Sequence, residues 1–310
     1  MITETYSPAE ESFNRHRQSF GLVAAPLVAI AIMLLPTALP PPAQRVAAVL
    51  ALMIVLWMTE ALPLAVTALL GPTLCIILGV ATAQVAFAPF ADPVIFLFIG
   101  SFILAEGMVV HRLDRRLAFT ALASAWVGSS GLRLVVAYAG VTGFLSMWMS
   151  NTATTAMMFP LGLAVLSELG RERKGDREFQ RYAMAMMLVT SFAATIGGMG
   201  TPVGSPPNLI GMGLLRTTAG INLTFTDWMI VGVPVMAATM VALALWFLIP
   251  RARNIHLGPE AVRTVAEELR KLGVMRRGER NVVMAFSVTV ALWVLPGVFS
   301  LALGDAHVVT

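Results

Sequence analysis

Charged residues are scarce in this 310-residue sequence: they make up 12% of the chain, about half of the share that is usual in soluble proteins. A soluble domain of this length covers its surface with charged and polar groups, and 17 acidic and 21 basic residues are too few for that. Hydrophobic residues make up 57% of the chain, and the mean hydropathy is +0.80. So much apolar surface collapses in water, which excludes an intrinsically disordered protein. The composition therefore predicts a helical polytopic membrane protein and argues against a soluble enzyme.

Cysteine and lysine are also nearly absent. The single cysteine, Cys75, lies in an apolar run, which excludes a disulfide framework and a cysteine metal cluster. The only lysines are Lys174 and Lys271, and the arginines cluster between apolar runs. Such clusters are typical of loops held on one side of a membrane rather than of a basic face that follows phosphates. We therefore expect no nucleic-acid partner.

Apolar runs set the expected membrane spans. About 20 apolar residues cross the hydrocarbon core of a bilayer once. The first run is longer than the core of a signal peptide, and no clear small-residue cleavage site follows it, so we expect a retained span. The predicted spans are 21–39, 45–62, 63–80, 93–110, 182–215, 227–249 and 281–301.

One apolar segment, 134–166, has the wrong length for an ordinary crossing. Its 33 residues are too many for one span and too few for two, and its centre is the polar run 150–155. Basic clusters at 112–116 and 171–181 flank the segment, and short cytoplasmic loops are the ones that carry such an excess. A re-entrant helical hairpin over about 130–169 keeps both clusters in the cytoplasm, so the sequence predicts this hairpin.

The hairpin also sorts the remaining basic residues. Only Arg45 and Arg216 then lie outside, against 19 basic residues inside. This sorting predicts a cytoplasmic N-terminal tail at 1–20 and a cytoplasmic linker at 250–280. Apolar residues keep helical spacing within the linker, which predicts an amphipathic helix at the membrane interface.

Two stretches interrupt the helical pattern at membrane depth. The first is the hairpin tip, 146–155, with the sequence Ser-Met-Trp-Met-Ser-Asn-Thr-Ala-Thr-Thr. The second, 195–208, holds four glycines and three prolines in 14 residues and cannot be continuous helix. Non-helical chain at this depth is tolerated only where it is buried in protein or lines a cavity. The span 182–215 is therefore predicted to be a broken helix.

Both breaks carry helix start signals. Asn151 or Thr152 is expected to N-cap the returning helix of the hairpin, and Ser205 followed by Pro206 starts the helix after the second break. Both breaks then direct free backbone N–H groups toward the middle of the protein, which suits a carboxylate. Carbonyl groups of the preceding half-helices, together with a hydroxyl or amide oxygen, suit Na⁺. One site is thus predicted to hold an anion and a cation together.

Structural interpretations compete with this site. A Ser-Asn-Thr run can join helices by hydrogen bonds, and glycines allow helices to pack closely. Two polar breaks at similar depth, flanked by basic loops, favour the functional interpretation. Glu60 and Glu106 lie near the ends of apolar runs, which favours structural roles for them. A membrane-embedded enzyme is disfavoured, because neither a histidine pair nor a conspicuous acid pair is available for catalysis.

The motifs resemble those of a known family. Ser-Asn-Thr-Ala-Thr at 150–154, followed about 50 residues later by Gly-Thr-Pro-Val-Gly-Ser-Pro-Pro-Asn at 200–208, resembles the divalent anion:sodium symporter family, which carries dicarboxylates, tricarboxylates or sulfate. The resemblance runs from the first span through the basic linker. It implies two inverted repeats, each with a re-entrant hairpin and a broken helix, and a homodimer that works by an elevator-type movement.

The resemblance also implies the residues of the site. Those implied for Na⁺ are Ser146, Ser150, the side chain of Asn151 and a carbonyl group at or near Gly200. Those implied for a substrate carboxylate are Asn151, Thr152, Thr201 and Pro202.

One Ser-Asn-Thr motif, one hairpin and one broken helix are expected in these 310 residues. We expect the first repeat over 21–249, the linker over 250–280 and the first span of a second repeat over 281–310. The second hairpin, the second Na⁺ site and the other half of the substrate site are expected to be missing, as in a fragment or a truncated gene product.

The resulting functional hypothesis is a secondary active transporter of the inner (plasma) membrane. It couples inward movement of Na⁺ to uptake of a divalent anion, with a C4-dicarboxylate such as succinate as the expected substrate. The alternatives are a Na⁺-independent anion exchanger or a sulfate carrier on the same scaffold, and a fragment that does not transport.

Overall fold

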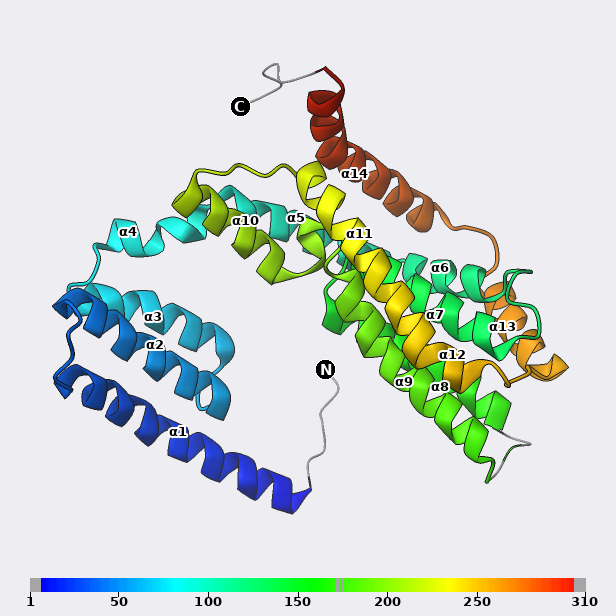
Figure 1. Cartoon of the computed structure of the whole chain (residues 1–310), viewed down its shortest axis with the longest axis horizontal. Helices are drawn as coiled ribbons and strands as arrows, with labels where there is room; N and C mark the ends of the chain where they lie inside the picture. Colours follow the sequence, from blue (N-terminus) through cyan, green and yellow to red (C-terminus); the bar gives the residue numbers. More distant parts are fainter. Residues whose placement is uncertain (1–6, 171–172, 174, 304–310) are drawn as a thin grey trace. The chain divides into compact units, whose positions relative to one another are not determined.

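The computed structural model describes residues 7–170, 173 and 175–303 (Figure 1). Parts of the predicted tail, of the basic cluster 171–181 and of the last span therefore lie outside the described residues. Apart from an isolated bridge between Ser130 and His256, the described residues form helices, turns and loops without β-structure. Among these described residues, six helical segments are long and apolar enough to cross a membrane. The prediction of an all-α polytopic membrane protein is confirmed.

The chain divides into two compact units, residues 1–93 and residues 94–310. The helices of the first unit are α1 (Pro8–Leu34), α2 (Pro41–Thr59), α3 (Leu64–Ile77), the short α4 (Ala83–Phe87) and the 3-10 turn η1 (Ala88–Ala91). Helix α3 has 14 residues and is about 21 Å long, shorter than a bilayer core and shorter than the predicted span 63–80.

Helix α1 begins inside the predicted N-terminal tail. The Ser7 side chain accepts a hydrogen bond from the backbone of Glu10, and the Glu10 carboxylate accepts one from Ser7, with Pro8 at the first helical position. This capping box starts the helix 13 residues before the first residue of the predicted span 21–39. Hydropathy alone located the apolar part of the helix and missed its polar first turns.

The second unit contains the helices over which the re-entrant hairpin and the broken helix are predicted, and re-entrance into the membrane stays a prediction. Helix α5 spans Pro93–Val110, the same residues as the predicted span 93–110, and α6 (Leu113–Leu122) follows. The hairpin helices are α7 (Gly131–Ser146) and α8 (Asn151–Gly170). The broken helix consists of α9 (Arg177–Gly197), the 3-10 turn η2 (Pro202–Gly204) and α10 (Pro206–Ala219). The remaining helices are α11 (Phe225–Leu243), the π-helical turn η3 (Ala244–Leu248), α12 (Ile249–Ala252), α13 (Pro259–Lys271) and α14 (Arg277–Leu303).

Helices α7, α8 and α9 pack together around one buried tyrosine. The Tyr138 hydroxyl on α7 donates to the carbonyl oxygen of Met158 on α8 at 2.8 Å and shares a hydrogen bond of 2.9 Å with the Thr190 hydroxyl on α9. Tyr138, Met158 and Thr190 are all fully buried. Because an unpaired hydroxyl costs free energy in an apolar interior, these bonds fix the two hairpin helices against the first half of the broken helix.

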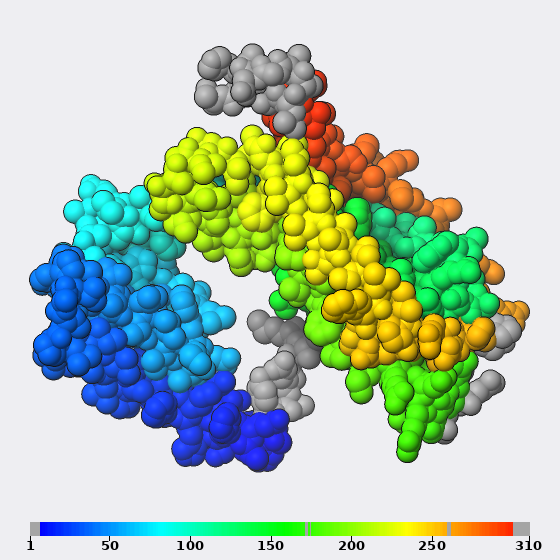
Figure 2. Space-filling model, in the orientation of Figure 1, coloured from blue at the N-terminus to red at the C-terminus, as the bar shows by residue number. Residues whose placement is uncertain are grey.

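Helices α11, η3 and α12 continue one another and run along the surface of the second unit (Figure 2). Apart from Arg251 in α12, their exposed residues are apolar, including Ile230, Val231 and Trp246. Exposed apolar side chains over such a length are expected where a helix faces lipid, since a bilayer removes the penalty that water imposes.

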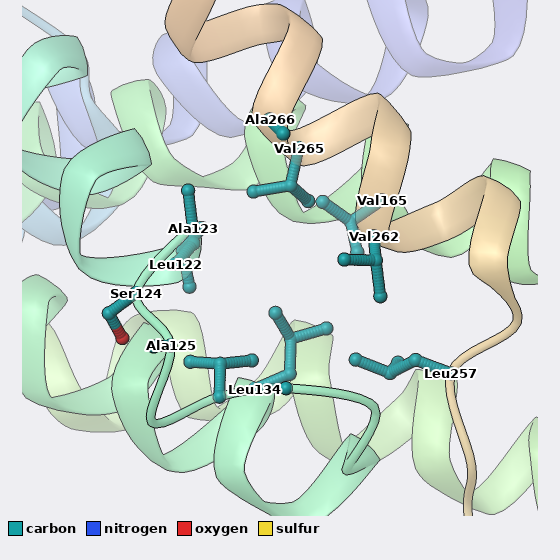
Figure 3. Close-up of a pocket in the computed structure, with 12 residues that line it drawn as sticks. Leu122, Ala123, Ser124, Ala125, Leu134, Val165, Leu257, Val262, Val265 and Ala266 are labelled. Carbon is teal, nitrogen blue, oxygen red and sulfur yellow. The ribbon is translucent and has the colours of Figure 1, made fainter.

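The predicted amphipathic linker helix corresponds to α13. Val265 on its buried face lies at the rim of an apolar cavity of about 140 Å³, which the hairpin helices and the loop after α6 also line (Figure 3). The helix therefore rests on the base of the hairpin, with its charged side chains on the other face.

The backbones of α7 and α9 touch at a pair of glycines. A Cβ atom added to Gly197 would lie 2.1 Å from the carbonyl oxygen of Gly143, so only glycine permits this approach. Gly140, also on α7, has open space around it.

We expect Gly197→Ala to destabilise the protein by about 1–3 kcal/mol, since the added methyl group meets backbone that cannot rotate away. The matched control, Gly140→Ala, is expected to be neutral or stabilising by up to about 1 kcal/mol, because alanine favours helix. Thermal unfolding of both variants in detergent measures the difference. Equal midpoints for Gly197→Ala and wild type would contradict the close contact.

Candidate functional site

Within the predicted tip 146–155, only the four residues 147–150 lie between α7 and α8, and from here on these four are called the hairpin tip. Met147, Trp148 and Met149 are buried, and the Trp148 ring stacks on Phe225 and meets Phe286 edge to face. These apolar contacts hold the tip against α11 and α14. The tip is thus buried in protein, as non-helical backbone at membrane depth requires.

The polar residues of the tip gather around Asn151. The Ser146 hydroxyl at the end of α7 donates to Asn151 Oδ1 at 2.8 Å across the tip. The Ser150 hydroxyl accepts a hydrogen bond from the backbone N–H of Ala153 at 3.2 Å. Ser150 therefore caps α8, and the prediction that Asn151 or Thr152 is the N-cap is wrong. As the first residue of α8, Asn151 keeps its side chain free of the cap and bonded to Ser146 instead.

The second break lies against this tip. Gly198, at the end of α9, approaches so closely that a Cβ atom there would lie 2.3 Å from Asn151 Oδ1. A Cβ atom added to Gly200, the residue predicted to offer a carbonyl group, would meet the side chains of Met147 and Met236. The structure thus brings Ser146, Asn151 and Gly198 together, with Gly200 two residues away along the chain.

Two side chains from the second break bind backbone atoms that the breaks leave unpaired. The buried Thr201 hydroxyl donates to the carbonyl oxygen of Met147 and accepts from the N–H of Gly204 at 3.1 Å. The Asn208 amide donates to the carbonyl oxygens of Gly198 at 2.7 Å and of Thr201 at 2.9 Å. Thr201 thus joins the second break to the hairpin tip, and Asn208 closes the second break on itself.

The two helix starts differ in what they offer an anion. Helix α8 begins with Asn151 and Thr152, and Thr152 is exposed. Ser205 precedes α10 as predicted, with Pro206 at its first position, but its side chain makes no capping bond. Pro206 and Pro207 lack N–H groups, and the N–H of Asn208 binds the carbonyl oxygen of Ser205. The start of α8 is therefore the better donor for a carboxylate, and the sequence prediction of free N–H groups at both breaks holds less well at α10.

Sequence reasoning missed two contributors to this region. Asn208 closes the motif 200–208, and nothing in the sequence indicated that its side chain would donate to two carbonyl oxygens. Thr154 is fully buried, and its hydroxyl has no hydrogen-bond partner among the described residues. The spacing of one helical turn from Ser150 and Asn151 was the signal that could have included Thr154 in the site.

Neutral oxygen atoms dominate the site. In the part of the chain that the structure describes, no three His, Cys, Asp or Glu side chains gather to hold a metal ion. Hydroxyl, amide and carbonyl oxygens suit a hard monovalent cation, and because these groups are neutral they do not repel an anion bound nearby.

Comparisons with known proteins give a consistent result. A family model described as the sodium:sulfate symporter transmembrane region matches residues 15–310. An uncharacterized transporter of Haemophilus influenzae is 44% identical over 197 residues, covering 63% of this chain and 40% of the relative. The sodium-dependent dicarboxylate transporters SdcS of Staphylococcus saprophyticus and Staphylococcus aureus are each 32% identical, over 89% of this chain and 54% of their own length. The chain thus spans about half the length of the curated relatives it matches.

We expect Thr201→Val to lower the free energy of unfolding by about 1–3 kcal/mol, because it leaves the Met147 carbonyl and the Gly204 N–H without their partner. Thr201→Ser keeps the hydroxyl and is expected to lose less than half as much. Thermal unfolding of the two variants in detergent tests this. If valine and serine had the same effect, methyl packing rather than the hydrogen bonds would hold the two breaks together.

Proposed function

Because the chain belongs to the divalent anion:sodium symporter family, we propose that it supplies the site at which Na⁺ and a divalent anion are bound for symport. The family consists of transporters, so the prediction that the chain is not an enzyme is confirmed. The proposed substrate is a C4-dicarboxylate such as succinate. The similarity to two sodium-dependent dicarboxylate transporters over 89% of the chain supports a dicarboxylate over sulfate.

The contact between Ser146 and Asn151 at the hairpin tip carries the proposal for Na⁺. This contact brings a hydroxyl and an amide oxygen to the C-terminal end of α7. Gly198, the residue that follows α9, lies beside the same amide oxygen. Helix ends of this kind carry the negative end of the helix dipole, which favours a cation. The proposed Na⁺ ligands are Ser146, Ser150, Asn151 and a backbone carbonyl in the segment from Gly198 to Gly200.

The start of α8 carries the proposal for the anion. Its first turn offers backbone N–H groups and the exposed hydroxyl of Thr152, and the positive end of a 20-residue helix favours a carboxylate there. Asn151 is both the first residue of α8 and a proposed Na⁺ ligand, so one residue links the two proposed ion positions. Thr201 and Pro202 are buried beneath the same region, and a carboxylate contact with them stays a prediction.

The proposal includes the setting of the site. We place the protein in the inner (plasma) membrane with its N-terminus in the cytoplasm, which the excess of basic residues in the predicted cytoplasmic loops supports. A homodimer is proposed from the family resemblance.

The test is uptake of labelled succinate by cells that lack their own dicarboxylate carriers and express the protein. We expect uptake in Na⁺ medium and none when choline replaces Na⁺. Asn151→Ala is expected to reduce Na⁺-dependent uptake about tenfold or more, a loss of ~1.4 kcal/mol in binding. The matched control Asn254→Ala removes an exposed amide in the loop after α12 and is expected to retain uptake.

Each alternative gives a different result. Uptake that persists in choline medium would contradict symport and indicate Na⁺-independent exchange. Sulfate that competes better than unlabelled succinate would make the protein a sulfate carrier. Absence of uptake in cells that contain the protein in their membrane would mean that the chain does not transport.

A further inference from the structure

A second polar pocket lies away from the hairpin tip, where α5 ends, α6 begins, α13 ends and α14 begins. Its volume is about 440 Å³. The lining is mostly basic, with His111, Arg112, Lys271 and Arg276 around one acidic residue, Glu279. The proposed transport function uses none of these side chains.

The acidic residue of the pocket is already neutralised. Glu279 is buried, with 4% of its surface exposed, and Arg116 contacts its carboxylate at 3.0 Å. Arg116 also donates to the carbonyl oxygens of Leu272 and Gly273, which fixes the loop between α13 and α14. The Lys271 side chain pairs with Glu268 in an exposed contact, and such pairs contribute little and exchange easily. The pocket therefore has an excess of positive charge that an anion can satisfy.

The backbone of Arg112 adds a second observation. Its φ angle is +59°, in the left-handed region that L-residues other than asparagine and aspartate rarely adopt. This conformation turns the chain from α5 into α6 and keeps Arg112 in the lining of the pocket. Strained residues of this kind concentrate at ligand sites, where contacts in the folded protein maintain them.

The pocket lies at the ends of two candidate membrane spans. One span ends at Val110, and another begins at Arg277. The two helices are neighbours at this end, since a Cβ atom on Gly107 would lie 3.6 Å from Val282 and one on Gly278 would lie 2.3 Å from His111 Nδ1. Where apolar spans end, a protein meets the phosphate layer of the bilayer, and basic pockets between helices bind lipid head groups there.

We propose that this pocket binds a phosphate ester, supplied by the head group of an anionic phospholipid. Guanidinium groups donate paired hydrogen bonds to phosphate oxygens, and Lys271 adds a compact charge. The amphipathic helix α13, which ends in the pocket, joins the hairpin base to α14. A bound head group would therefore hold this linker at the membrane surface.

Native mass spectrometry of the purified full chain tests the proposal, with phosphatidylglycerol and phosphatidylcholine as probes in a neutral detergent. The variant Arg112→Gln/Lys271→Gln/Arg276→Gln removes three positive charges from the pocket. The matched control Arg253→Gln/Arg270→Gln/Arg277→Gln removes three charges from exposed positions outside the pocket lining. Circular dichroism tests whether each variant is folded. If the triple pocket variant does not fold, the single variant Lys271→Gln, which changes an exposed side chain, replaces it in the comparison.

We expect phosphatidylglycerol to bind about tenfold more tightly than phosphatidylcholine. The pocket variant is expected to lose this preference while the control keeps it, because the basic residues of the pocket attract an anionic head group. Excess inorganic phosphate distinguishes the two sources of the ligand. If it displaces the lipid, a soluble phosphate ester is the ligand; if it does not, the head group is. Equal binding of the two lipids, or equal losses in the two triple variants, would overturn the proposal.

Discussion

The hydrogen bond from the Thr201 hydroxyl to the carbonyl oxygen of Met147 is the contact on which the rest of the second unit depends. Backbone groups that leave a helix at membrane depth cannot be satisfied by water, so the protein must supply their partners. Thr201 does so for both breaks at once, because it also accepts the N–H of Gly204. The two breaks therefore cannot be separated without leaving polar backbone atoms unpaired in an apolar interior.

Close helix packing makes this contact possible. Gly143 and Gly197 allow α7 and α9 to touch through their backbones. Farther from the hairpin tip, Tyr138 joins the same two helices to α8. The hairpin and the first half of the broken helix thus form one packed group, and the polar side chains of Ser146, Asn151 and Thr201 meet where the two breaks lie together. Asn151 emerges from this group with its amide oxygen already bound by Ser146, so the site is held in place before any ion arrives.

Sequence reasoning predicted those features that local chemistry determines. Glycines and prolines at 195–208 broke the helix where expected, the length of 134–166 gave the hairpin, and α5 has the predicted bounds. The cap of α8 was misplaced by one or two residues, because serine, asparagine and threonine are all good caps and their order in the sequence does not rank them. The role of Thr201 was beyond reach, since its acceptor lies 54 residues earlier and only the packing of α7 on α9 brings them together. The basic pocket was missed for the same reason, because its lining comes from 110–112 and from 271–279. The acceptors of Asn208, Gly198 and Thr201, lie only ten and seven residues earlier, but the turn that brings them to its side chain is set by the broken helix as a whole.

The most direct test of this account is hydrogen exchange of the backbone amides at the two breaks, measured on the purified chain in Na⁺ and in choline. If Na⁺ binds between Ser146, Asn151 and the end of α9, it protects the amides of 146–155 and of 195–208 together, because the ion and the Thr201 bond join the two segments. The helix α2, in the other compact unit, should show no change and serves as the internal reference. Unchanged exchange at both breaks, or protection of one without the other, would contradict the account.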